Sequence, residues 1–304
     1  LDTDKEMVMK SLDILEMFIP EGVVFTKVDA LSSTGNYIDT IKLLETVKKD
    51  SVDYDKALYL KGVNQYNYSG VTKTKNNQTH NELSLKLAED SKKTFEELID
   101  YINTDKTDII QEKKEKRVIW VREAKKSIAF LLMSLEDFKK ALPALITLND
   151  EYKKTPEDKK HPNRLSVLRN IIIANNSIYG AEKENNVKQE MLPKIESFYT
   201  EIKELDIATF ELKDKSKTAE ENKKKILIDI GKRVGMMLIM NPLKDPKLIS
   251  RGIELLNEGG KENKIENMDL FLARKFLELN EVESAIMCLK KVLKEYEDKG
   301  GSSP

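Results

Sequence analysis

The chain has 304 residues, of which 39% are hydrophobic and 35% charged, and its formal net charge is −1. A neutral chain lacks the electrostatic attraction that nucleic-acid binding normally needs, so no nucleic-acid partner is predicted. The apolar fraction is low for a compact enzyme of this length and suits an elongated protein. Gly and Pro are scarce, at 12 and 8 residues, which favours helices over a strand-rich fold.

Cysteine content and hydropathy limit the cellular compartments in which the protein could function. The chain has one cysteine, Cys288, so an intrachain disulfide is excluded and a reducing compartment fits. The longest apolar run, around 236–240, is too short to span a bilayer, and no transmembrane segment is predicted. We expect a cytoplasmic protein, with an exported form whose signal peptide has been removed as the open alternative.

Helical periodicity runs through the first half of the chain. The predicted helices are a leading helix that ends at Pro20, followed by 24–31, 38–47, 56–68, 80–102, 112–135 and 138–152. The stretch 71–79 is rich in Asn, Lys and Thr, and we predict that it is a loop insertion within the second helix pair.

The second half continues the same alternation of helices and short connections. The predicted helices are 165–179, 187–205, 224–240, 246–257, 268–279 and 282–296. Residues 207–218 are polar and weakly patterned, and we find no convincing strand. Six helix pairs with short connections predict an all-α fold, an α-solenoid that forms a single helical-repeat domain over residues 1–299. Residues 300–304 are expected to be a flexible tail.

Three of the pairs share a pattern of small and large residues. The last pair has Leu272-Ala273 in its first helix and Ala285 in its second, and the middle pair has Ile128-Ala129 and Ala141 at corresponding places. Small residues are needed where two helices cross closely. The first pair carries the turn Gly35-Asn36-Tyr37 but has Thr40 where a small Ala is usual.

This pattern resembles the tetratricopeptide-repeat family, whose unit is a helix–turn–helix of about 34 residues. The resemblance implies a right-handed superhelix of about six antiparallel helix pairs. Another α-solenoid with similar packing is the alternative, and it leaves the expected class of function unchanged.

The resemblance also implies that the first helix of each pair lines a concave groove. The candidate partner-binding residues at the matching positions are Tyr59, Val63, Tyr66, Lys126, Phe130, Met133 and Arg274. Aromatic and Met side chains with a few basic groups suit a bound peptide or helix. The alternative interpretation is that the aromatic and aliphatic members of this set are core residues.

One subtype of the family clamps the C-terminal carboxylate of chaperones with Lys, Asn and Arg side chains. At the matching positions this chain has Phe25, Asp29 and Val63. Lys126 fits the clamp, but Phe130 replaces the Arg. The resemblance therefore implies that a chaperone C-terminal tail is not a partner.

The residues that usually carry catalysis are sparse and scattered. The two histidines, His80 and His161, both fall in or next to predicted loops, and no spacing of His and Cys suits zinc. Gly231-Lys232 lacks the preceding glycine of a phosphate-binding loop. We predict no catalytic residue, no cofactor and no metal.

The sequence thus predicts a non-catalytic scaffold or adaptor that binds a protein or peptide. Such a protein would serve as a subunit of a larger assembly, for example a trafficking, transport or secretion complex. The alternatives are a regulatory receptor for a short peptide and an enzyme built on a helical scaffold. A bound peptide would favour the receptor, and a deep pocket with clustered titratable groups would favour the enzyme.

Overall fold

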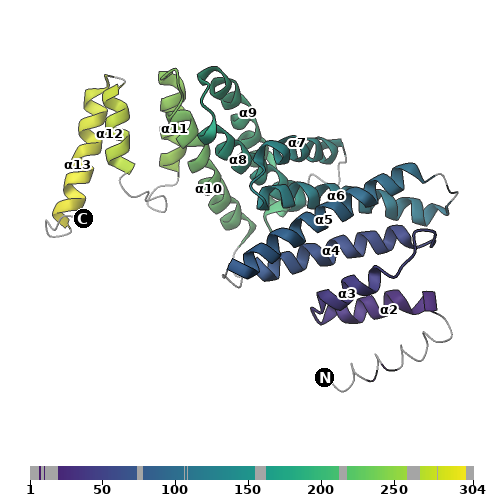
Figure 1. Cartoon of the computed structure of the whole chain (residues 1–304). Coiled ribbons are helices and arrows are strands. Elements are labelled where there is room, and N and C mark those ends of the chain that lie inside the picture. The colour runs from purple at the N-terminus through teal and green to yellow at the C-terminus, as the bar shows by residue number, and fades with distance from the viewer. Residues whose placement is uncertain are drawn as a thin grey trace. The chain divides into compact units, whose positions relative to one another are not determined.

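The computed structural model describes residues 20–73, 78–105, 107, 109–154, 162–211, 218–258, 268–278 and 280–298, together with residues 7 and 10. All regular structure in these residues is helical, which confirms the all-α prediction (Figure 1). The chain divides into two compact units, Leu1–Ala144 and Leu145–Pro304, which are described separately. A single repeat domain over residues 1–299 stays a prediction.

The first unit is a series of helices in which those from α2 to α6 each pack on the next helix along the chain. The helices are α2 (Pro20–Ser33), α3 (Tyr37–Leu44), α4 (Tyr54–Lys73), α5 (Gln78–Thr104), α6 (Gln111–Ser134) and the start of α7 (Phe138–Lys154). From α2 to α6 each helix contacts the next, and α6 also contacts α4 (Figure 1). This contact between alternate helices is how successive hairpins stack in a helical-repeat protein.

The second unit repeats this arrangement. Its helices are α8 (Pro162–Ala181), α9 (Asn185–Glu204), the short 3-10 helix η2 (Ile207–Phe210), α10 (Ala219–Ile239), α11 (Pro246–Glu258), α12 (Met268–Glu278) and α13 (Val282–Asp298). Helix α10 contacts α9, α8 and α11, while α12 and α13 form a close pair. Both units are therefore compatible with a helical-repeat architecture.

Three helix pairs are joined by the same turn. Gly35, Glu136 and Asn280 have positive φ angles of 73°, 59° and 63°. In each case the second helix of the pair begins two residues later. In the turn after α6, the N–H of Asp137 donates to Leu132 O at 2.9 Å. This hydrogen bond satisfies a backbone carbonyl at the end of the helix, as in a common helix C-cap.

Each of these turns also places a small residue in the core. Thr40, Ala141 and Ala285 each follow the positive-φ residue by five positions, and all three are fully buried. The predicted burial of Ala141 and Ala285 is confirmed. Thr40 fits the same place because its hydroxyl donates to Asn36 O at 2.8 Å, so that its polar group is satisfied.

Helices α4 and α5 approach each other closely at Gly62. A Cβ atom there would lie 2.7 Å from the ring of Phe95, too close for any real contact. On the same side of α4, the Ser91 hydroxyl donates to Gly62 O at 2.9 Å. The absence of a side chain at Gly62 therefore lets Phe95 fill the space between the helices.

A buried ion network ties α4 to α6. The Arg117 guanidinium donates to Asp55 at 2.6 Å and to Asp105 at 2.7 Å, and the Asp55 side chain is completely buried. Lys113 lies 3.2 Å from the other Asp55 oxygen. A buried carboxylate is tolerated only when it is paired in this way.

The structure differs from the sequence expectations in two segments. Val71–Lys73 forms the last turn of α4 and Thr79 lies in the first turn of α5, so the expected loop insertion at 71–79 is helical at both ends. Within 207–218, Thr209 and Phe210 are fully buried in a 3-10 turn that packs against α10. The leading helix before Pro20, the expected loop at 155–161 and the tail at 300–304 lie outside the described residues.

Candidate binding pocket

A pocket of about 640 Å³ opens in the first unit where three helix ends meet. The last turns of α4 and α6 and the first turns of α5 surround it, because α4 and α6 both run antiparallel to α5. Its lining residues are Tyr66, Ser69, Gly70, Lys73, Asn81, Ser84, Leu85, Ala88, Leu131, Ser134, Leu135 and Glu136. The volume lies within the range of small-ligand and side-chain pockets.

A pair of buried serines fixes one wall of the pocket. The Ser69 hydroxyl donates to Ser84 O at 3.0 Å, and the Ser84 hydroxyl donates to Ser69 O at 2.9 Å. These two reciprocal hydrogen bonds join the end of α4 to the start of α5, and both side chains involved are small. Because both hydroxyls already donate hydrogen bonds within the protein, this wall offers little free hydrogen-bonding capacity.

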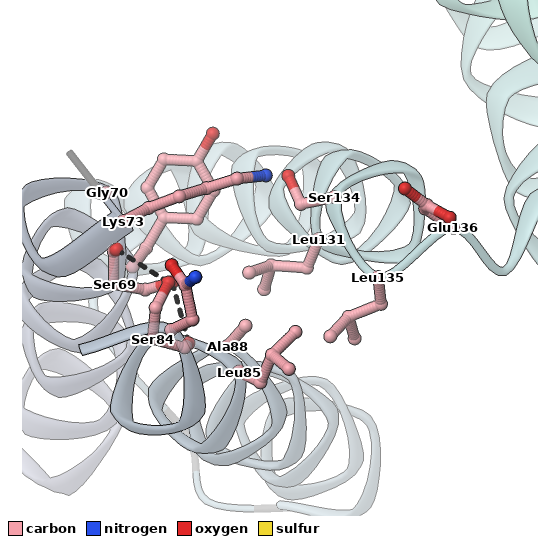
Figure 2. A pocket seen from close by; sticks show the side chains of 12 residues that line it. Ser69, Gly70, Lys73, Ser84, Leu85, Ala88, Leu131, Ser134, Leu135 and Glu136 are labelled. Carbon is pink, nitrogen blue, oxygen red and sulfur yellow. Dashed lines mark hydrogen bonds between the residues drawn. The ribbon is translucent and has the colours of Figure 1, made fainter. Parts of the chain in front are cut away.

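The pocket has an apolar floor and a charged edge. Figure 2 shows the polar ends of Lys73, Ser134 and Glu136 along its upper side. The apolar side chains drawn below them are those of Leu131, Leu135, Leu85 and Ala88. Leu85 is 51% exposed although it faces apolar neighbours, so covering it would be favourable. The arrangement suits an apolar group that carries polar or charged atoms at one end.

Gly70 leaves the pocket open beside α4. No atom lies within 4 Å of the place where its Cβ would be, in contrast to Gly62. Tyr66, one turn before it, is half-buried, and burial raises the pKa of its phenol above the ordinary value near 10. Tyr66 is therefore a neutral, largely apolar wall at physiological pH.

The α4 members of the expected groove lie against the core of the first unit. Tyr59, Val63 and Tyr66 are half-buried and pack on a cluster of buried residues from α4, α5 and α6. Tyr59 also stacks on Trp120 of α6, with ring centroids 5.6 Å apart. Of the residues that we predicted to bind a partner, only Tyr66 lines the pocket.

The α6 members of that groove lie on a different face. Helix α6 meets the cluster through Trp120, Ala124, Ile128, Leu131 and Leu135, which recur every three or four residues. Phe130 stands about 100° around the helix from Leu131, and Lys126 and Met133 share its side. The structure therefore does not bring the two predicted sets onto one face.

The basic members of the expected groove are placed differently from one another. Lys126 pairs with Glu123 on its own helix. Arg274 is exposed on α12, in the second unit. A binding role for either residue stays a prediction.

Most residues that line the pocket were not predicted as site residues. Lys73 was missed because residues 71–79 resembled a loop, although they include the last turn of α4. Glu136 belongs to a turn, and a turn residue carries no periodic signal. The repeated small residues Ser69, Gly70 and Ser84 were the available clue, since small side chains at helix ends leave space between helices.

Two classes of site are not found in the part of the chain that the structure describes. There, no group of three or more His, Cys, Asp or Glu side chains is arranged to hold a metal ion. None of the described helices is both long and apolar enough to cross a membrane.

No protein-family profile matches the chain, and no curated protein sequence matches it.

Proposed function

We propose that this protein is a non-catalytic scaffold or adaptor that binds a partner protein through a peptide segment, with one apolar side chain of that segment seated in the pocket of the first unit. The observation that carries the proposal is the pocket itself, with its apolar floor and charged edge. A peptide suits this mixture because its side chain can bury apolar area while its backbone and neighbouring charges meet the edge.

The helical-repeat architecture supports the same proposal. The shared turns at Gly35, Glu136 and Asn280 and the contact of α6 with α4 agree with tetratricopeptide-like hairpins. Such hairpins commonly expose helix faces for peptide binding, and we extend the proposal to a right-handed superhelix of that kind. In this arrangement the charges of Lys73 and Glu136 would orient the bound segment.

A receptor for a short peptide is the second candidate. A pocket of about 640 Å³ holds only a few side chains, so a free peptide of a few residues could fill it. A scaffold would bind the segment within a larger protein, whereas a receptor would bind the free peptide with comparable affinity.

The test is a selection of displayed random peptides against the full-length chain. The selected peptides are then synthesised and titrated into wild type, Gly70→Met and Gly180→Met by calorimetry. Both glycines have open space around the Cβ position, but only Gly70 lines the pocket. Gly180→Met is thus a matched control that adds the same side chain on α8.

We expect the selected peptides to share an aromatic or aliphatic anchor and to lose most of their affinity for Gly70→Met. Their affinity for Gly180→Met should match that for wild type. If both variants bind equally well, the pocket is not the binding site. If no peptide is selected, the peptide-binding proposal fails.

A further inference from the structure

A row of exposed apolar side chains runs along one face of α13. Five side chains of this helix, each at least 41% exposed, make up the row that we call the α13 stripe: Val282, Ile286, Leu289, Leu293 and Tyr296. Their spacings of four, three, four and three residues are those of a coiled-coil seam. Five large apolar residues at such spacing on one exposed face are unusual for a surface that only meets water.

The α13 stripe is separate from the face that holds α13 in its own unit. Ala285 and Cys288 are buried, and Cys288 belongs to the apolar cluster that also contains Leu272 and Ala273 of α12. These buried positions lie roughly 90° around the helix from the stripe. The side chains of Val282, Ile286, Leu289 and Leu293 are therefore exposed on a face other than the one that contacts α12.

The charges beside the stripe are complementary to a second copy of the same helix. Glu283 and Lys290 lie on one flank of the seam, seven residues apart, and both are exposed. Neither forms an ion pair with another residue that the structure describes. In a coiled coil, flanking charges of this kind set the partner and its orientation.

One antiparallel register satisfies both the apolar and the charged residues. If Ile286 lies opposite Leu289 of a second copy, then Val282 lies opposite Leu293 of that copy. Each facing pair forms one layer of the seam, and the two-fold symmetry repeats each layer, which gives four layers in all. The same register brings Glu283 beside the second Lys290, again twice. A parallel pairing places Ala285 and Val292 opposite the flanking charges and forms no such ion pairs.

We propose that the chain forms a symmetric homodimer through antiparallel pairing of the α13 stripe with the stripe of a second copy. The inference is independent of the pocket, which lies in the first unit. The four central layers form a short seam, so the dimer is expected to dissociate on dilution.

The test is sedimentation equilibrium of the full-length chain over a wide range of concentration. Wild type should show a reversible monomer–dimer equilibrium. Leu289→Glu combined with Leu293→Glu should remain a monomer, because each glutamate would then be buried without a partner against Ile286 or Val282 of the second copy. Both residues are exposed in the single chain, so the fold should survive, and circular dichroism checks it.

A charge exchange tests the register without changing the apolar stripe. Glu283→Lys alone and Lys290→Glu alone should each weaken dimerisation about tenfold, because two symmetric attractions become repulsions. The double variant should recover the wild-type constant. Lys225→Glu, at an exposed lysine on α10, changes the net charge by the same amount as Lys290→Glu and should leave the dimerisation constant unchanged.

Three results would overturn the proposal. Wild type could be monomeric at every concentration, which would leave the stripe unpaired. Dimerisation could persist in the Leu289→Glu/Leu293→Glu variant, which would place the interface elsewhere. A failure of the double charge exchange to restore dimerisation would exclude the antiparallel register.

Discussion

Gly235 of α10 and Gly252 of α11 face each other at the crossing of the two helices. A Cβ atom at Gly235 would lie 2.8 Å from Gly252 O, and one at Gly252 would lie 2.6 Å from Gly235 O. The two backbones therefore touch where a side chain on either helix would hold them apart.

Replacing either glycine by alanine should destabilise the second unit. A rigid backbone oxygen blocks the added methyl group, and overpacking of this kind costs about 1–3 kcal/mol. The helix propensity of alanine offsets at most about 1 kcal/mol of that cost. Urea denaturation of Gly235→Ala and Gly252→Ala measures the change in unfolding free energy.

Gly180→Ala is the control, because the space around that position is open. It should leave stability unchanged or raise it slightly. Equal stability of Gly252→Ala and Gly180→Ala would show that α10 and α11 do not cross at this pair.

Enlarging the small residue after a shared turn should also destabilise the fold. Ala141 and Ala285 are fully buried. Leucine at either place would force the helices apart, at a cost of about 1–3 kcal/mol. Thermal melts of Ala141→Leu and Ala285→Leu test this, and an unchanged melting temperature in both would contradict the common register of the turns.

Replacing Arg117 should lower the unfolding free energy far more than replacing a neighbouring surface lysine. Among the described residues, Arg117→Met leaves the buried Asp55 carboxylate with Lys113 as its remaining ionic partner, and breaking a buried pair costs about 3–5 kcal/mol. Lys116→Met removes only an exposed pair with Glu112 and should cost less than about 1 kcal/mol. Chemical denaturation that gave equal losses for the two variants would refute the buried network.

Low pH should destabilise the first unit because Asp105 becomes protonated. Hydrogen bonds from the Thr107 hydroxyl and backbone N–H, together with the Arg117 guanidinium, lower the pKa of Asp105 from its ordinary value near 3.8 to about 2. A carboxylate with a lowered pKa stabilises the folded state above its unfolded pKa, and that stabilisation is lost as the pH falls toward the folded pKa. The unfolding free energy should therefore decline from about pH 4 to pH 2.

Thr107→Val removes the hydroxyl hydrogen bond, which lowers the pKa of Asp105 more than the other contacts do, and should bring that pKa back toward 3.8. The variant should then lose less stability than wild type over the same pH range. Urea denaturation at a series of pH values gives, for wild type and for the variant, the slope of the unfolding free energy against pH. Identical slopes would mean that Thr107 does not hold the Asp105 carboxylate in its charged form.

The sequence predicted most helices because apolar residues recur at helical spacing. Helix α13, expected over 282–296, is Val282–Asp298 in the structure, and the other described pairs agree comparably well. The local sequence pattern gave wrong predictions in segments whose structure depends on contacts with distant residues. Phe210 is buried within a polar stretch, and Thr72 is buried in the last turn of α4 within an apparent loop.

The pocket could not be predicted from helical periodicity, because it depends on how each helix is rotated about its axis. Helix α4 buries Asn64, Gln65 and Ser69 as well as apolar residues, so its sequence does not show which face points inward. Hydrogen bonds to other helices satisfy these polar groups: Thr94 of α5 donates to Gln65 at 2.8 Å, Ser69 donates to Ser84 O of α5 at 3.0 Å, and Ser32 of α2 donates to Asn64 at 3.1 Å. Partners so distant in sequence leave no local signal.

Hydrogen–deuterium exchange of the full-length chain, with and without a library-selected peptide, tests the proposed binding site most directly. The account predicts that the peptide slows exchange in the segments that line the pocket, 66–73, 81–88 and 131–136, and that Gly70→Met abolishes this protection. Protection confined to α8–α13, or unchanged exchange in all three segments with the peptide bound, would contradict it.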